Sequence, residues 1–254
     1  MSLTSLGRWR RSELKVATVV VGVAAGAWAL TADRMAGMNA GPGAELGSLS
    51  WFAISWLLMM AAMMLPAIMP AVIVCVRRPG RAGEAGQFVA GYLAVWLAAG
   101  LVAYVGAGSV RSLQFGFLAW GNAGRWVAAT LIAAAGVYQL TPSKDTCLRR
   151  CRDHRMILRD HRRGGLGLGI QHGGFCVGCS WVLMAALFAL GVMNLTWMGV
   201  VAALIAAERL LPRPAPLVVA LILAGLSVSV ALVPGDLPGF TTPGSHPPPA
   251  MQMR

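Results

Sequence analysis

Four of the five cysteines are the residues of this chain whose type and spacing are best suited to chemistry. Cys176 and Cys179 form a Cys-x-x-Cys pair at the start of a long apolar run, and Cys147 and Cys151 form a Cys-x-x-x-Cys pair upstream of it. Residues three or four positions apart lie on the same face of a helix. If the flanking residues are helical, each pair therefore presents two sulfurs on one side.

Both cysteine pairs are expected to bind a soft transition metal. Thiolates suit Cu(I) and zinc, and the orientation deduced below puts both pairs at the cytoplasmic face, where disulfides rarely persist. Copper is the favoured metal and zinc the second candidate. Two other interpretations stay open: the cysteines pack as small apolar residues, or the Cys-x-x-Cys pair is redox-active.

Two further residues can complete such a site. His172 lies four residues before Cys176 and continues its helical stripe, so it is a candidate ligand. Glu208 closes a later apolar run, where an acid is costly without a partner. Glu208 is therefore interpreted as a ligand or as the carboxylate partner of His172 or Lys144, with a plain interfacial residue as the alternative. Polar side chains before the first cysteine pair are candidates to support the ligands: Tyr138, Gln139, Thr141 and Lys144.

A methionine-rich segment upstream offers thioether ligands. Met59 and Met63 lie four residues apart on one helical face, ahead of Pro66. Thioethers suit Cu(I), and a proline inside a helix frees backbone carbonyls. The two methionines are therefore candidate ligands or part of a path for the metal, although methionine is also an ordinary filler of apolar interiors.

The elements that carry these residues are predicted to be membrane helices. The 254 residues are 57% hydrophobic and only 12% charged, about half the charge of a soluble domain. Several apolar runs approach the roughly 20 residues that cross a bilayer as a helix. The prediction is an all-α polytopic bundle of about seven transmembrane helices, at about residues 16–31, 49–76, 87–106, 126–140, 174–193, 195–207 and 217–233. The number is six if the short sixth segment enters the membrane and returns to the same side.

The basic residues predict the orientation. Of the 21 Lys and Arg residues, 17 fall in segments that share a side with the N-terminus and four fall in the others, which favours a cytoplasmic N-terminus. The net charge of +12 is thus explained by topology, and no nucleic-acid partner is expected. The partners expected are the lipid bilayer, the metal ion and another membrane or metal-handling protein.

The chain is predicted to form one transmembrane domain over residues 1–234, with a basic cytoplasmic loop at 143–169, followed by a disordered Pro-rich tail at 235–254. It shows no phosphate loop, dinucleotide fingerprint or nucleophile elbow. These absences argue against an ATP-driven pump. Whether the protein is an enzyme stays open, and a role without catalysis is favoured.

Three blocks of sequence resemble an uncharacterised bacterial family of predicted metal-binding integral membrane proteins: MMAAMMLPAIMP from Met59, YQLTPSKDTCLRRC from Tyr138, and GGFCVGCSWVLMAALFALGVMNLTWM from Gly173, with Glu208 after it. The resemblance implies a multi-pass protein of the bacterial inner membrane that binds metal. The family pattern often has another cysteine where this chain has Ser180, and a lysine where it has Arg209.

The leading functional hypothesis is a membrane protein that handles copper through paired cysteines at the cytoplasmic face. A membrane oxidoreductase that uses the thiols or a bound metal is the second hypothesis. A third is a metal-free transporter or assembly partner, in which Asp33 and Glu208 couple to protons.

Overall fold

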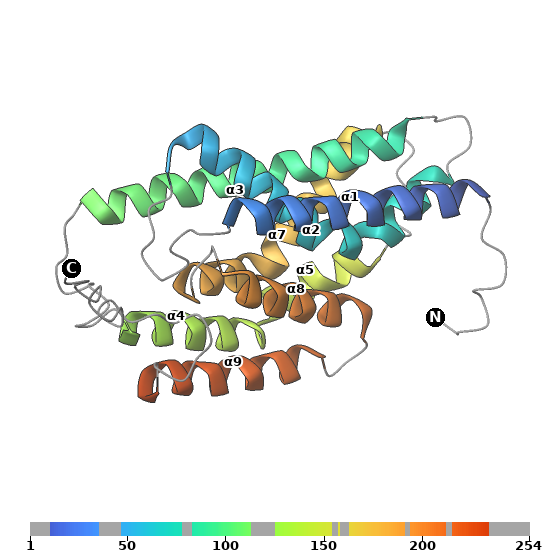
Figure 1. Ribbon diagram of the computed structural model, residues 1–254. Helices are drawn as coiled ribbons and strands as arrows, with labels where there is room; N and C mark the ends of the chain where they lie inside the picture. Colours follow the sequence, from blue (N-terminus) through green and yellow to red (C-terminus); the bar gives the residue numbers. More distant parts are fainter. Residues whose placement is uncertain are drawn as a thin grey trace, which may run out of the picture.

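The protein is built from helices alone over the part of the chain that the structure describes. The computed structural model describes residues 11–35, 47–77, 83–112, 125–153, 157, 163–190, 194–211 and 215–233. These residues form eight helices and no strand (Figure 1), which confirms the all-α prediction for them. The helices are α1 (Arg11–Met35), α2 (Leu49–Val76), α3 (Glu84–Ser112), α4 (Arg125–Tyr138), α5 (Pro142–Arg152), α7 (Gly165–Leu190), α8 (Leu195–Leu210) and α9 (Ala215–Leu232).

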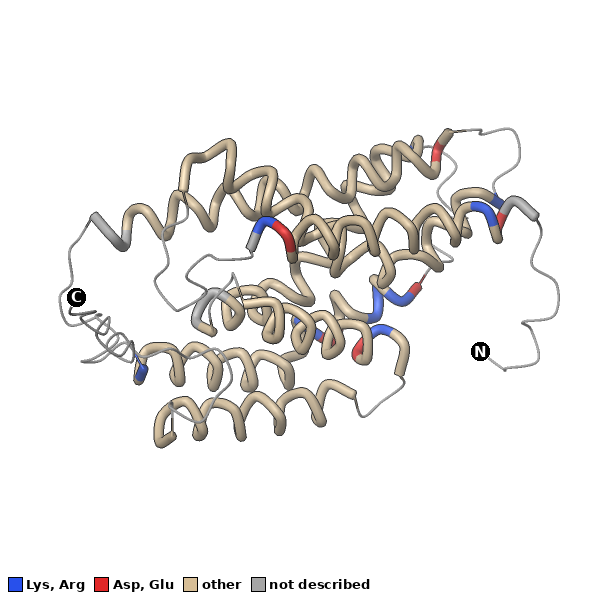
Figure 2. The backbone as a smooth tube through the Cα atoms, viewed as in Figure 1, with Lys and Arg blue, Asp and Glu red and all other residues tan. Residues whose placement is uncertain are grey.

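Five of these helices are long and apolar enough to cross a membrane: α1, α2, α3, α7 and α9. Figure 2 shows that the charged residues of the described chain gather near helix ends and around α5, so the middles of the long helices are uncharged. Helix α4 is apolar but has only 14 residues, and α8 has 16. The structure thus contains five helices with the dimensions and composition of membrane spans.

Helices α2 and α7 are the most buried of the five and form the centre of the bundle. Helix α1 packs on α2, α2 packs on α3, and α3 packs on α7; on the other side of α7, α4 packs against α9. Helix α8 contacts α2, α7 and α9, and the short α5 contacts α7 and α8. The cysteine-bearing start of α7 therefore lies where several helices meet.

The contact between α3 and α7 is close because glycines line it. A Cβ atom added at Gly165 or Gly169 would overlap the backbone oxygen of Glu84 or Phe88, and one added at Gly173 would lie 3.0 Å from the side chain of Val95. Small residues at four-residue spacing let helix backbones approach in this way. The approach brings the aromatic face of α3 against the segment of α7 that carries the cysteines.

The segment expected to be a basic loop, 143–169, is partly helical. Helix α5 occupies its beginning, and α7 starts at Gly165 rather than near residue 174. Thr141 caps α5, because its side chain accepts a hydrogen bond from the Lys144 backbone N–H at 3.3 Å, and Pro142 fits the first turn. The sequence contains these capping signals, but hydropathy alone does not detect a polar helix. The predicted Pro-rich tail, 235–254, lies outside the described residues.

Replacing Gly169 with alanine is expected to destabilise the protein, because the new Cβ would collide with backbone, which cannot move aside as a side-chain end can. Overpacking of this kind costs about 1–3 kcal/mol. Gly174 is the matched control, since nothing lies within 4 Å of a Cβ there and alanine is the better helix former by about 1 kcal/mol. Thermal unfolding in detergent should show a lower Tm for Gly169→Ala and an unchanged or higher Tm for Gly174→Ala; equal Tm values would contradict the close approach.

Candidate metal site

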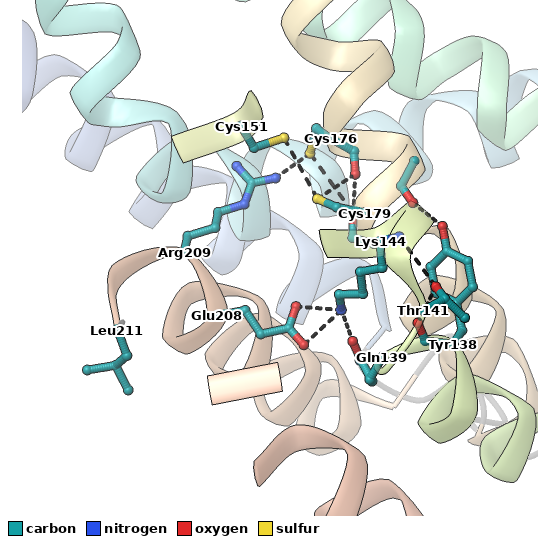
Figure 3. A network of polar contacts seen from close by, with 12 residues as sticks. Tyr138, Gln139, Thr141, Lys144, Cys151, Cys176, Cys179, Glu208, Arg209 and Leu211 are labelled. Atoms are coloured by element: carbon teal, nitrogen blue, oxygen red, sulfur yellow. Dashed lines mark hydrogen bonds and ion pairs between the residues drawn. The ribbon is translucent and has the colours of Figure 1, made fainter. Parts of the chain in front are cut away.

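Three of the four candidate cysteines come together where α5 meets α7 (Figure 3). The Sγ atoms of Cys151 on α5 and Cys179 on α7 lie 3.8 Å apart. Cys179 Sγ also donates to the backbone oxygen of Cys176, one turn earlier, at 3.2 Å. All three side chains are buried and none is in a disulfide. The expected convergence of the two pairs is therefore seen for these three thiols.

The fourth thiol, Cys147, lies at the margin of the cluster. It is half-buried, one turn before Cys151 on α5. Its Sγ rests against α7, so that a Cβ added at Gly178 would be 2.9 Å from it. The helical conformation of α5 puts both of its cysteines toward α7, as the spacing predicted, with Cys147 closer to the surface.

Polar groups from two other helices surround Cys176. The Tyr92 hydroxyl on α3 lies 2.9 Å from its Sγ, and the guanidinium of Arg209 at the end of α8 donates to the same sulfur. Ser180 Oγ lies 4.0 Å away and donates to the Cys176 backbone oxygen at 2.7 Å. The sulfur of Cys176 therefore accepts from Arg209 and has the hydroxyls of Tyr92 and Ser180 as neighbours, whereas the sulfurs of Cys151 and Cys179 face each other.

A buried ion pair lies beside the cysteines. Lys144 Nζ contacts both carboxylate oxygens of Glu208 at 2.8 and 2.7 Å and also donates to Gln139 Oε1. The two charged side chains are only 1% and 2% exposed. Burial lowers the pKa of Lys144 below its ordinary value, while the Glu208 carboxylate acts in the opposite direction. Of the interpretations given for Glu208, the structure bears out the carboxylate partner of Lys144.

Helix α5 is tied to α8 by a second cation. Arg152 donates to the backbone oxygens of Glu208 and Leu211, the latter at 2.8 Å. The last carbonyls of a helix have no partner within it, and basic side chains can satisfy them. Lys144 and Arg152 thus fix both ends of α5 to the end of α8, and this attachment sets Cys151 opposite Cys179.

The polar residues expected to support the site do contact it. The Tyr138 hydroxyl donates to the backbone oxygen of Gly178 at 2.7 Å, within the turn that joins Cys176 to Cys179. Gln139 accepts from Lys144, and Thr141 caps α5. Each holds a cysteine-bearing helix or the ion pair in place.

The other candidate ligands occupy different surroundings. His172 is 4% exposed and packs near the rings of Phe88 and Tyr92, with centroids 5.6 and 6.1 Å away. Met59 and Met63 are buried in the core along α2. Within the described residues, no set of three or more His, Cys, Asp or Glu side chains is arranged as a preformed metal site. The metal ligands that the geometry offers are the touching sulfurs of Cys151 and Cys179, with the sulfur of Cys176 nearby.

Two residues at the site were not predicted from the sequence. Tyr92 lies in the middle of an apolar run, and a buried tyrosine hydroxyl usually has a partner, which is the signal that marks it. Arg209 follows Glu208 at the end of α8, and its side chain turns back to Cys176. No pattern within one helix shows that contact, because it joins α7 to α8.

A comparison with protein families matches residues 53–232 of this chain to PpoB2, copper chaperone. The chain belongs to this family. The match covers all of α2 but its first residues and every helix from α3 to α9, and therefore every cysteine of the site, the ion pair and the methionines of α2. Membership of the PpoB2 copper chaperone family supports the expectation of copper handling. Searches of curated proteins and of solved structures found no match.

Breaking the buried ion pair is expected to be costly. Glu208→Gln or Lys144→Met leaves one buried charge without its partner, which costs about 3–5 kcal/mol. The double variant should cost less than the sum of the two, because it leaves no unpaired charge. The exposed pair Asp145–Arg149 on α5 is the control, and Asp145→Asn should change stability by at most about 1 kcal/mol. If the Tm of Glu208→Gln were no lower than the Tm of Asp145→Asn, the ion pair would not be what holds α5.

Proposed function

We propose that the protein is a membrane copper carrier that binds Cu(I) between Cys151 and Cys179. The observation that carries this proposal is the 3.8 Å contact between their sulfurs. Metal–sulfur bonds of about 2.3 Å join sulfurs up to about 4.6 Å apart, so a single ion fits between the two with little movement. Thiolates are the ligands that favour Cu(I).

Copper is the cargo in this proposal. The other candidate ligands have supporting roles that differ from residue to residue. Cys176 is the adjoining sulfur and Cys147 the thiol nearest the surface, where a metal-handling partner can exchange copper with the buried pair. Glu208 acts through Lys144 by holding α5 in place. His172 is an auxiliary ligand, and Met59 and Met63 form a low-affinity path through the core.

The proposed carrier has seven transmembrane segments in the bacterial inner membrane, with its N-terminus in the cytoplasm. The Glu13–Arg77 ion pair of 2.9 Å supports a common side for the start of α1 and the end of α2, and the close approach of Gly165 to Glu84 does so for the starts of α7 and α3. A helix of 14 residues is about 21 Å long, so α4, like α8, needs its flanking residues to cross about 30 Å of hydrocarbon. The copper site then lies at the cytoplasmic face.

The second candidate function is thiol exchange. The contact between Cys151 and Cys179 favours it, because sulfurs that already touch need little movement to form a disulfide. An oxidoreductase of this kind would be captured as a mixed disulfide with its substrate after Cys179→Ser. A carrier would not require that intermediate.

Copper binding tests the proposal directly. Protein purified without oxygen should take up Cu(I) against a chromophoric chelator, and Cys151→Ser or Cys179→Ser should weaken that uptake by about tenfold or more, since each removes a ligand. Cys75 is buried in α2, so Cys75→Ala is the matched control and should bind as the wild type does. X-ray absorption should report sulfur ligands. Equal binding by a variant that lacks all four candidate cysteines would sink the proposal.

A further inference from the structure

Arg209 lies beside the cysteine pair and forms no ion pair with an acid among the described residues. Its guanidinium donates to Cys176 Sγ, and its Nε atom is buried with no hydrogen-bond partner among the described residues. The neighbouring carboxylate of Glu208 is bound on both oxygens by Lys144. A buried positive charge is costly unless an anion balances it. The site therefore needs a negative charge that the thiol form of the protein does not supply.

The sulfurs are the groups placed to supply that charge. Figure 3 shows the Arg209 guanidinium pointing toward the sulfurs of Cys151 and Cys176. Cys176 accepts a hydrogen bond from Arg209, and its sulfur lies 2.9 Å from the Tyr92 hydroxyl. Cys151 and Cys179 touch each other, so they are the pair between which a metal replaces the two thiol protons.

We infer that Arg209 makes the site selective for a monovalent metal, an inference that rests on the proposed function. Binding of Cu(I) by two thiols releases two protons and leaves a complex with one negative charge, which Arg209 neutralises. Zn(II) in the same place gives a neutral complex, so the buried cation stays unbalanced. Charge balance in a buried site thus favours Cu(I) over Zn(II).

The coordination numbers of the two metals also favour binding of Cu(I) over Zn(II). Structural zinc sites almost always have four protein ligands. Beyond the touching pair lie the sulfur of Cys176, which Arg209 contacts, and the carboxylate of Glu208, which Lys144 contacts, while Cys147 lies at the margin of the cluster. Arg209 therefore already contacts the adjoining sulfur, and it also supplies the charge that a two-sulfur Cu(I) complex requires.

Competition with chelators for Cu(I) and, separately, for Zn(II) tests this selectivity. Arg209→Gln removes the charge and should lower the Cu(I) affinity by about 10- to 100-fold, the range of a charged hydrogen bond, without lowering the Zn(II) affinity. Arg209→Lys keeps the charge and should retain most of the preference. Arg149 is an exposed cation on α5, so Arg149→Gln is the control and should leave both affinities unchanged.

Proton release from the wild-type protein gives a second measurement that does not depend on folding of a variant. About two protons should leave per Cu(I) bound at neutral pH. Release of three protons per Cu(I) would overturn the inference. An unchanged ratio of Cu(I) to Zn(II) affinity in Arg209→Gln, which includes an equal loss for both metals, would also overturn it. Wild-type protein that bound no Cu(I) would instead overturn the proposed function, so the two failures are distinct.

Discussion

The ion pair between Lys144 and Glu208 is the interaction on which the site depends. Two opposite charges that are almost completely buried hold each other because neither can return to water without separating the helices that carry them. Helix α5 is short and mostly polar; Leu148 and Cys151 pack it on the core, and the ion pair fixes it to α8. With Lys144 bound to Glu208 on α8, Cys151, two turns further along α5, is held facing α7.

The second constraint is the glycine-lined contact of α3 with α7. Without side chains between them the two backbones touch, so Tyr92 reaches the sulfur of Cys176. The cluster is thus assembled by three separate contacts, with α3, α5 and α8 each approaching the same turn of α7.

The long helices could be predicted from the sequence, and the contacts between them could not. The bounds of α2 follow from an unbroken apolar run that ends before Arg77, and structure and prediction agree there. Helix α5 was not predicted as a helix, because its helical signals are its capping residues and its charges, whereas the spans were predicted from hydropathy. The pairing of two cysteines across α5 and α7 was predicted from topology, but the turn of Arg209 toward Cys176 was not, because side-chain direction at a helix end depends on the neighbouring helix.

The division of the touching thiols between two helices links cargo to conformation. A ligand that binds only the docked arrangement of α5 adds its binding free energy to docking, and by the same linkage whatever loosens α5 weakens the ligand. In the proposed carrier, the copper-loaded and copper-free forms therefore differ in how firmly one eleven-residue helix is held. A protein that receives the metal need not compete for sulfur alone, since a contact that draws α5 away from α8 separates the two ligands.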